Sequence, residues 1–190
     1  MAQLSFGKRR KRVNYDLVRE VIVWIVQIAI VCTLAFACVW YFGFKVSTIG
    51  DSMKPELQNG DITLLNRLVY DVRKPKRGEV VAFKPNGNEN SHYYIKRIIG
   101  LPGETIEYRD GNLLIDGDIL EEEYTTTEME DLGLLEDPIT LGSGEYFVLG
   151  DDRLNSDDSR IANIGNVKKE EIAGKVWFVV SPMQNFGFVK

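Results

Sequence analysis

The sequence predicts a mainly β protein, in which a single N-terminal transmembrane helix precedes one all-β domain. Residues 21–42 contain no charged side chain, which is typical of a membrane span. Beyond them, short apolar segments alternate with clusters of Gly, Pro, Asn and Asp, as in strands joined by turns. No long segment after residue 42 repeats its apolar residues at the helical period of about 3.6.

The charge-free run has the length of a transmembrane helix. At about 1.5 Å per residue, a helix of residues 21–42 spans the roughly 30 Å hydrocarbon core of a bilayer. The alternative is a cleaved signal peptide, because Ala35-Phe36-Ala37 has the small-x-small form of a cleavage site. The run continues past that point to Phe42, and its aromatic end suits a membrane interface, so an uncleaved anchor is predicted.

Basic residues lie mostly on one side of this run. Five consecutive ones occupy positions 8–12, within a tail of residues 1–20, whereas only Lys45 follows the run closely. Because positive charge is retained in the cytoplasm, the tail is predicted to be cytoplasmic. Residues 43–190 then form the extracytoplasmic domain of a single-pass protein of the cell membrane.

The domain is expected to consist of short strands. They comprise residues 62–65, 80–83, 93–99, 105–108, 113–115, 146–149 and 175–180. Asp110-Gly111 stands between two of them and predicts a hairpin, because Gly tolerates the positive φ of a tight turn. Residues 121–137 hold eight acids and no Lys or Arg, and are expected to form a solvated loop or insertion.

Composition argues against several kinds of function. The net charge of −5 does not suggest a basic face for nucleic acid. Cys32 and Cys38 both lie inside the apolar run, so they indicate no disulfide, and cysteine spacing typical of a metal site is absent. His92 is the single histidine, which excludes a His-based metal cluster. No metal and no cofactor are therefore predicted.

Ser52 lies in the stretch Gly50-Asp-Ser-Met-Lys-Pro55, ten residues beyond the predicted helix. A serine beside Gly and Pro is usually a turn residue, yet such a turn also exposes backbone N–H groups next to the hydroxyl. At about 3.3 to 3.6 Å per residue, the segment from the end of the predicted helix to Ser52 reaches at most roughly 36 Å, so Ser52 is held near the bilayer surface.

Lys96 lies in the predicted strand 93–99, next to Arg97. The two-residue period places Lys96 on the face of Tyr94 and Ile98 and Arg97 on the opposite face, so one of the two cations should be partly buried. One interpretation is a lysine whose stem lies along apolar surface with its ammonium in water. The other is a buried lysine that is neutral at working pH and takes a proton from a serine.

The loop from Gly150 to Arg160, with the sequence GDDRLNSDDSR, concentrates carboxylates, arginines and hydroxyls after a predicted strand. Some acidic loops bind calcium. Arg153 breaks the alternation of an EF-hand, however, and no Gly or late Glu stands at the required offset. A structural ion-pair loop is the better interpretation.

Together, the serine, lysine and charged-loop stretches occur in the order found in one family. The chain resembles the bacterial type I signal peptidases, or leader peptidases, over nearly its whole length, from the anchor through residues 60–61 to residues 174–177. The resemblance implies a Ser-Lys serine endopeptidase that removes signal peptides from secretory preproteins on the outer face of the membrane. Ser52 would be the nucleophile and Lys96 the general base.

The oxyanion site is less clearly defined by this resemblance. The backbone N–H of Ser52 is a natural donor to the developing oxyanion. Some members of the family add a hydroxyl from the residue two places before the nucleophile, and that place is Gly50 here. The oxyanion site is therefore either made by the backbone alone or completed by another group.

The charged loop would support the base. By the resemblance, Ser156 orients the Lys96 amine through a hydrogen bond, while Asp158 and Arg160 hold the site together. The resemblance implies these roles because the three residues stand at positions that match those of the family's loop.

The same loop is expected to contact the predicted strand of residues 93–99, which contains Lys96. Asp151 would pair with Arg97. Asp152 occupies a place where the family usually has Asn, which adds a charge to the loop. That departure leaves Ser52 and Lys96 untouched.

The family's substrates carry small residues one and three places before the cut, which calls for shallow apolar pockets and an extended peptide added to a strand edge. Met53, Leu57, Tyr94 and Ile95 match pocket-side positions. Packing in the core is the alternative for these four side chains. Precursors held at the bilayer by their own apolar segments would share a surface with the enzyme, which raises their local concentration.

Three other functions fit parts of the sequence. A signal-peptidase-like protein without activity, assisting the assembly of surface structures, is one, although Ser52 and Lys96 are both present. A self-cleaving Ser-Lys regulator is another, but such proteins are typically soluble and joined to a DNA-binding region. A Ser-His-Asp hydrolase built on His92 is the third, and His92→Ala separates it from the Ser-Lys mechanism. The sequence leaves the oligomeric state open.

Overall fold

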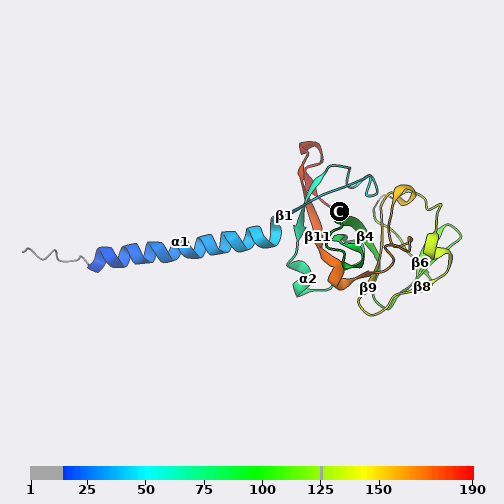
Figure 1. Cartoon of the computed structure of the whole chain (residues 1–190), viewed down its shortest axis with the longest axis horizontal. Helices are drawn as coiled ribbons and strands as arrows, with labels where there is room; N and C mark the ends of the chain where they lie inside the picture. The colour runs from blue at the N-terminus through cyan, green and yellow to red at the C-terminus, as the bar shows by residue number, and fades with distance from the viewer. Residues whose placement is uncertain (1–14, 125) are drawn as a thin grey trace, which may run out of the picture. The chain divides into compact units, whose positions relative to one another are not determined.

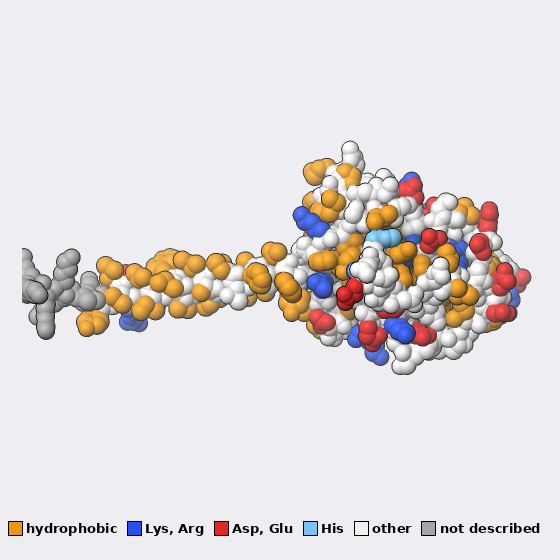
Figure 2. All heavy atoms as spheres, in the orientation of Figure 1, with side chains coloured by type: hydrophobic (Ala, Val, Ile, Leu, Met, Phe, Trp, Pro, Cys, Tyr) orange, Lys and Arg blue, Asp and Glu red, His pale blue; other side chains and the backbone are white. Residues whose placement is uncertain are grey.

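The computed structural model describes residues 15–124 and 126–190, and the chain divides into two compact units between residues 39 and 40. Within the described residues, α1 (Tyr15–Phe42) is the one helix long and apolar enough to cross a membrane (Figure 1). Hydrophobic side chains cover most of its visible face (Figure 2). The helix begins earlier than predicted, so residues 15–20 of the expected tail are helical. The basic positions 8–12 lie outside the described residues.

Two antiparallel sheets form the second unit. The larger has the strand order β1-β2-β11-β3-β4-β9-β10, with β12 also paired to β11, and the smaller has the order β7-β6-β5-β8. The strands of the larger sheet are β1 (Phe44–Ser47), β2 (Ile62–Asn66), β3 (Val80–Phe83), β4 (Tyr94–Gly100), β9 (Glu145–Leu149), β10 (Val167–Lys168), β11 (Ile172–Ser181) and β12 (Gly187–Phe188). Those of the smaller sheet are β5 (Thr105–Arg109), β6 (Asn112–Ile115), β7 (Asp118–Ile119) and β8 (Ile139–Thr140).

Helical segments in this unit are short. They are α2 (Val69–Val72) and the 3₁₀ turns Pro85–Gly87, Gly133–Glu136, Arg153–Asn155, Lys169–Glu171 and Met183–Asn185. The mainly β class predicted from the sequence is therefore confirmed.

Every predicted strand is present, with ends that differ by up to three residues. The hairpin is also confirmed: Asp110 and Gly111 have φ of 53° and 80° and join β5 to β6. The strands that the sequence pattern missed are β1, β7, β8, β10 and β12. All are four residues or shorter, so pairing with a neighbouring strand defines them rather than a long alternation of side chains.

The prediction that residues 121–137 are simply a solvated loop or insertion is wrong in part. Met129 and Leu135 are buried, and they pack in a core cluster with Ile106 of β5 and Phe147 of β9. Acidic side chains of this domain do gather at the surface near β6 and β8 (Figure 2). The segment thus has a solvated acidic face and an apolar face that closes the core between the two sheets.

Candidate active site

Ser52 lies in the turn between β1 and β2. Met53 and Leu57 follow it, and both side chains are fully buried in the core cluster beneath the larger sheet. The backbone N–H of Leu57 donates to the Met53 carbonyl, which closes one tight turn. Two buried apolar anchors directly after the serine therefore fix the turn, while Ser52 itself stays half-buried.

Lys96 and Arg97 are both buried, with exposed fractions of 3% and 1%. The expectation that one of the two cations would be partly buried is confirmed, and burial extends to both of them. Residues 95–100 of their strand β4 are all buried, so both of its faces are covered. Lys96 is hydrogen-bonded to Ser52, and Arg97 to Asp151. The interpretation of Lys96 as a lysine with its ammonium in water is therefore wrong.

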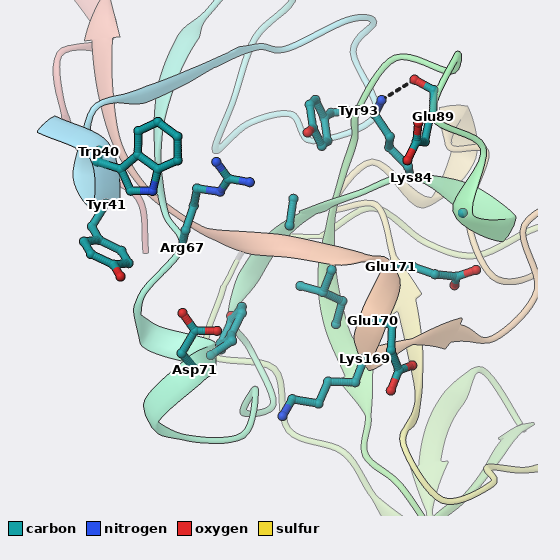
Figure 3. Close-up of a pocket in the computed structure, with 14 residues that line it drawn as sticks. Trp40, Tyr41, Arg67, Asp71, Lys84, Glu89, Tyr93, Lys169, Glu170 and Glu171 are labelled. Carbon is teal, nitrogen blue, oxygen red and sulfur yellow. Dashed lines mark hydrogen bonds between the residues drawn. The ribbon is translucent and has the colours of Figure 1, made fainter. Parts of the chain in front are cut away.

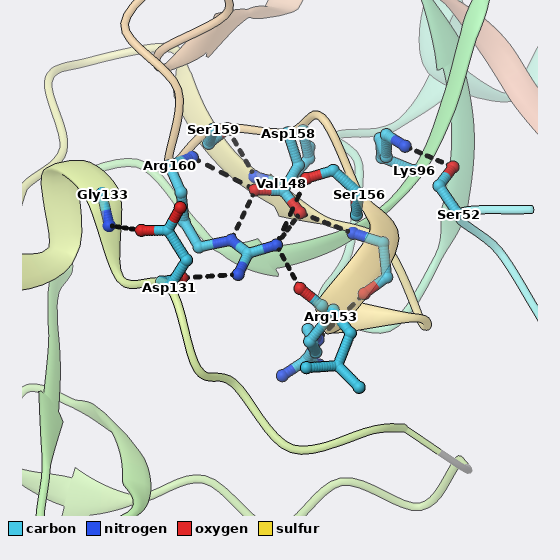
Figure 4. A network of polar contacts seen from close by, with 12 residues as sticks. Ser52, Lys96, Asp131, Gly133, Val148, Arg153, Ser156, Asp158, Ser159 and Arg160 are labelled. Carbon is cyan, nitrogen blue, oxygen red and sulfur yellow. Dashed lines mark hydrogen bonds and ion pairs between the residues drawn. The ribbon is translucent and has the colours of Figure 1, made fainter.

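The Lys96 amine reaches the serine directly. Its Nζ donates a hydrogen bond to Ser52 Oγ over 2.5 Å, although the two residues are 44 positions apart (Figure 4). Burial lowers the pKa of Lys96 to about 8, against the opposing attraction of Asp158 and Asp157. Because an ammonium is costly to bury, the neutral amine is accessible at mildly alkaline pH, in the form that accepts a proton.

The charged loop is organised around Asp158 and Arg160, which are both buried. The Arg160 guanidinium donates to both carboxylate oxygens of Asp158, over 2.8 and 2.9 Å, and also to the carbonyl of Arg153 (Figure 4). Asp158 additionally accepts from the N–H of Gly150. The loop therefore folds back on the residue that follows β9 and becomes a rigid unit.

The pair expected between Asp151 and Arg97 is present and fully buried. Arg97 donates to both carboxylate oxygens of Asp151, over 2.8 and 2.6 Å. The ring of Tyr124 covers the guanidinium, with its centroid 4.0 Å away. The pair attaches the charged loop to β4, in which Arg97 directly follows Lys96.

The Ser156 hydroxyl is buried and has no hydrogen-bond partner within the described residues. The predicted hydrogen bond from Ser156 to the Lys96 amine is not formed in this structure. Its Oγ lies close to Gly150, where an added Cβ would come within 2.2 Å of it. Ser156 thus places a buried hydroxyl without a partner among the described residues next to the turn of Ser52.

The charge added by Asp152 is well accommodated. Its carboxylate accepts from the backbone and the side chain of Asn155, over 3.3 and 3.0 Å, and from the Thr127 hydroxyl. Its backbone N–H donates to the carbonyl of Ser52 over 3.1 Å. Asp152 thus caps a 3₁₀ turn and at the same time holds the turn that contains Ser52.

Sequence reasoning missed the contribution of the acidic segment to this site. Glu122 forms an ion pair with the buried Arg153, whose Nε donates to the carbonyl of Gly150. Further along, the carbonyl of Asp131 accepts from Arg160. The signal in the sequence was charge complementarity, because the acid-rich segment faces a loop with two arginines.

A pocket of about 320 Å³ opens onto the Ser52–Lys96 pair. Tyr94 and Ile95 line it, although Ile95 also packs in the core cluster that contains Met53 and Leu57. Met53 and Leu57 do not line it, and the structure places both in the core, in line with the alternative interpretation. Met53 and Leu57 thus anchor the turn of Ser52 from the core and form no part of the pocket wall.

Gly50 and His92 also line this pocket. Gly50 has a φ of 82°, and a Cβ there would meet nothing within 4 Å, while its N–H donates to the side chain of Asn59. His92 is exposed and stacks on Tyr94, with ring centroids 4.8 Å apart. No hydrogen bond joins His92 to Ser52 among the described residues, so its position is that of a wall residue.

The domain also has a cavity larger than the one at Ser52. It has a volume of about 1130 Å³ and is lined by aromatic, basic and acidic side chains, among them Trp40, Arg67 and Lys169 (Figure 3). Neither Ser52 nor Lys96 contributes to it. Because its cations and carboxylates are mixed, it selects no single charge, and the smaller pocket remains the candidate active site.

A serine hydroxyl hydrogen-bonded to a buried lysine amine, at an open pocket of a mainly β domain, is the arrangement of a serine hydrolase. Residues 21–181 match the model of the signal peptidase family, peptidase S26. The chain therefore belongs to the signal peptidase family and is a type I signal peptidase, a hydrolase of the serine protease class.

Individual relatives agree with this assignment. Signal peptidase I P of Bacillus subtilis subsp. natto is 35% identical over 96% of this chain and 98% of its own length. Signal peptidase I T of Bacillus subtilis is 39% identical over 70% and 71%, and signal peptidase IB of Staphylococcus aureus is 30% identical over 88% and 93%. A solved signal peptidase I from Enterococcus faecalis is 39% identical, covers 55% of this chain and 97% of its own, and has a TM-score of 0.44.

Proposed function

We propose that this protein cleaves N-terminal signal peptides from secretory preproteins after small-x-small sites, with Ser52 as nucleophile and Lys96 as general base. The observation that carries the proposal is the hydrogen bond between Lys96 Nζ and Ser52 Oγ. Burial of the lysine supports it further, because it lowers the pKa of the amine to about 8.

The chemistry follows from this pair. Neutral Lys96 takes the proton of Ser52 as Oγ attacks the scissile carbonyl carbon, and the backbone N–H of Ser52 stabilises the oxyanion. The Lys96 ammonium then gives its proton to the leaving amine, which releases the mature protein. A water molecule, deprotonated by Lys96, hydrolyses the acyl-enzyme and frees the signal peptide.

Membrane anchoring through α1, with a cytoplasmic N-terminus, forms part of the proposal. Ser52 follows the end of α1 at Phe42 by ten residues, so the active site would work near the bilayer. Substrates with apolar signal segments are held at that same surface.

The test uses the full chain in detergent or lipid with a preprotein that carries a small-x-small site. Ser52→Ala and Lys96→Ala are each expected to abolish cleavage, whereas His92→Ala retains it. Cleavage by either dyad variant would refute the mechanism. Loss of cleavage in His92→Ala alone would favour a histidine base, and a folded wild type without activity would favour an assembly factor.

A further inference from the structure

Asp157 stands out among the residues around the Ser52–Lys96 pair. Asp157 lines the same pocket as Ser52 and Lys96, and His92 lines this pocket as well. The Asp157 side chain is exposed, and no hydrogen bond or ion pair of its carboxylate occurs within residues 15–124 and 126–190. The mechanism proposed above assigns it no role.

The other charges of the pocket do not neutralise Asp157. Asp51, the second acid in the lining, is paired with Lys54 over 3.0 Å. Lys96 is the only lysine or arginine that lines this cavity among the described residues, and it must be neutral to act as a base. The working form of the site therefore presents one uncompensated carboxylate to a bound peptide.

We propose that Asp157 makes the site charge-selective, favouring preproteins with a basic side chain next to the small-x-small site and disfavouring those with an acidic one there. This inference rests on the proposed function. An extended peptide that passes Ser52 brings its flanking side chains within the same pocket as the Asp157 carboxylate. Attraction or repulsion between charges that share one pocket acts on the peptide in both the bound and the transition state.

The experiment compares preproteins that differ at a single residue, which is Lys, Gln or Glu. This residue is placed in turn at each position flanking the cut, except the two positions that must carry small residues. For each enzyme, the ratio of kcat/KM for the Lys substrate to that for the Glu substrate is measured at a pH above the pKa of Lys96. Taking the ratio within one enzyme cancels any change in the reactivity of the dyad.

Wild type is expected to prefer Lys over Glu by about 2- to 30-fold at one or more positions, the range of an exposed attraction replaced by a repulsion. In Asp157→Asn the ratio should fall to near one. Asp118→Asn is the matched control, because it removes an exposed aspartate in β7 of the other sheet and should keep the preference. Added salt should weaken the preference of wild type.

The outcomes separate this inference from the proposed function. If wild type cleaves the Gln substrate but discriminates at no position, or if Asp157→Asn keeps the full ratio, the role of Asp157 is refuted while signal peptide cleavage stands. If wild type cleaves none of the substrates, the proposed function itself is overturned, and the inference falls with it.

Discussion

The backbone N–H of Asp152 donates to the carbonyl of Ser52, and this 3.1 Å hydrogen bond joins the turn of Ser52 to the charged loop. The contact needs a glycine beside it. A Cβ on Gly150 would lie 2.4 Å from the Ser52 carbonyl oxygen and 2.2 Å from Ser156 Oγ. The two segments can approach this closely only because position 150 has no side chain.

Gly150→Ala is therefore expected to push the loop away from Ser52. Overpacking of this kind costs about 1 to 3 kcal/mol of stability, and cleavage should fall by at least about 100-fold because Ser52, the proposed nucleophile, is displaced. Denaturant titration and kcat/KM are the measurements. Gly187→Ala is the control, since a Cβ there meets nothing within 4 Å, and equal behaviour of the two variants would contradict the prediction.

Cleavage should rise with pH as Lys96 loses its proton. The folded pKa of about 8 lies below the ordinary value of 10.5, because burial disfavours the ammonium. The profile of kcat/KM should show one ascending limb centred near that value. A flat profile from mildly acidic to alkaline pH would rule out Lys96 as the base.

The same shift links stability to pH. Between the folded pKa of about 8 and the ordinary value of 10.5, the unfolded chain binds more protons at Lys96 than the folded chain does. The contribution of this residue to the free energy of unfolding should therefore increase as pH rises through that window. Lys96→Met should lose this increase, as measured by denaturant titration at several pH values.

Ser156→Ala is predicted to separate stability from activity. Its hydroxyl is buried without a hydrogen-bond partner within the described residues, so its removal should leave the free energy of unfolding unchanged or higher. If Ser156 orients Lys96 during the reaction, kcat/KM should still fall by about 10- to 100-fold. Unchanged kinetics would show that Ser156 has no part in catalysis.

Breaking the buried Arg97–Asp151 pair should destabilise the domain. Asp151→Asn leaves the Arg97 charge uncompensated, at a cost of about 3 to 5 kcal/mol. Arg109→Gln removes one partner of the exposed Arg109–Glu107 pair and should cost less than about 1 kcal/mol. Denaturant midpoints of the two variants test this, and similar midpoints would mean that the buried pair is no more important than the surface pair.

The acidic segment should matter for catalysis through Arg153. Glu122→Gln removes the partner of a buried guanidinium that holds the Gly150 carbonyl, so both stability and kcat/KM should fall. Glu128→Gln, at an exposed position of the same segment, should change neither. The two variants carry the same change of charge, so an equal loss in both would point to net charge instead of the ion pair.

Much of the architecture is encoded locally. The absence of charge over residues 21–42 predicts a helix long and apolar enough to cross a membrane, and alternating segments bounded by turn residues predict strands such as β3 and β4, because these patterns are properties of the chain itself. The order of the serine, lysine and loop stretches was likewise sufficient to place the chain in its family. The start of α1 could not be predicted in this way, because polar residues can extend a helix without leaving an apolar pattern in the sequence.

The site depended on contacts between distant segments. The sequence alternation assigned Lys96 and Arg97 to opposite faces, but only the segments that pack against each face decide whether it is covered, and here both faces are. In the same way, the fold brings Lys96 to Ser52. It also places the acidic segment, which the sequence suggested was solvated, in contact with the charged loop through the Glu122–Arg153 ion pair. The residue types were readable from the sequence, whereas burial, and with it the lowered pKa of Lys96, arises only from tertiary packing.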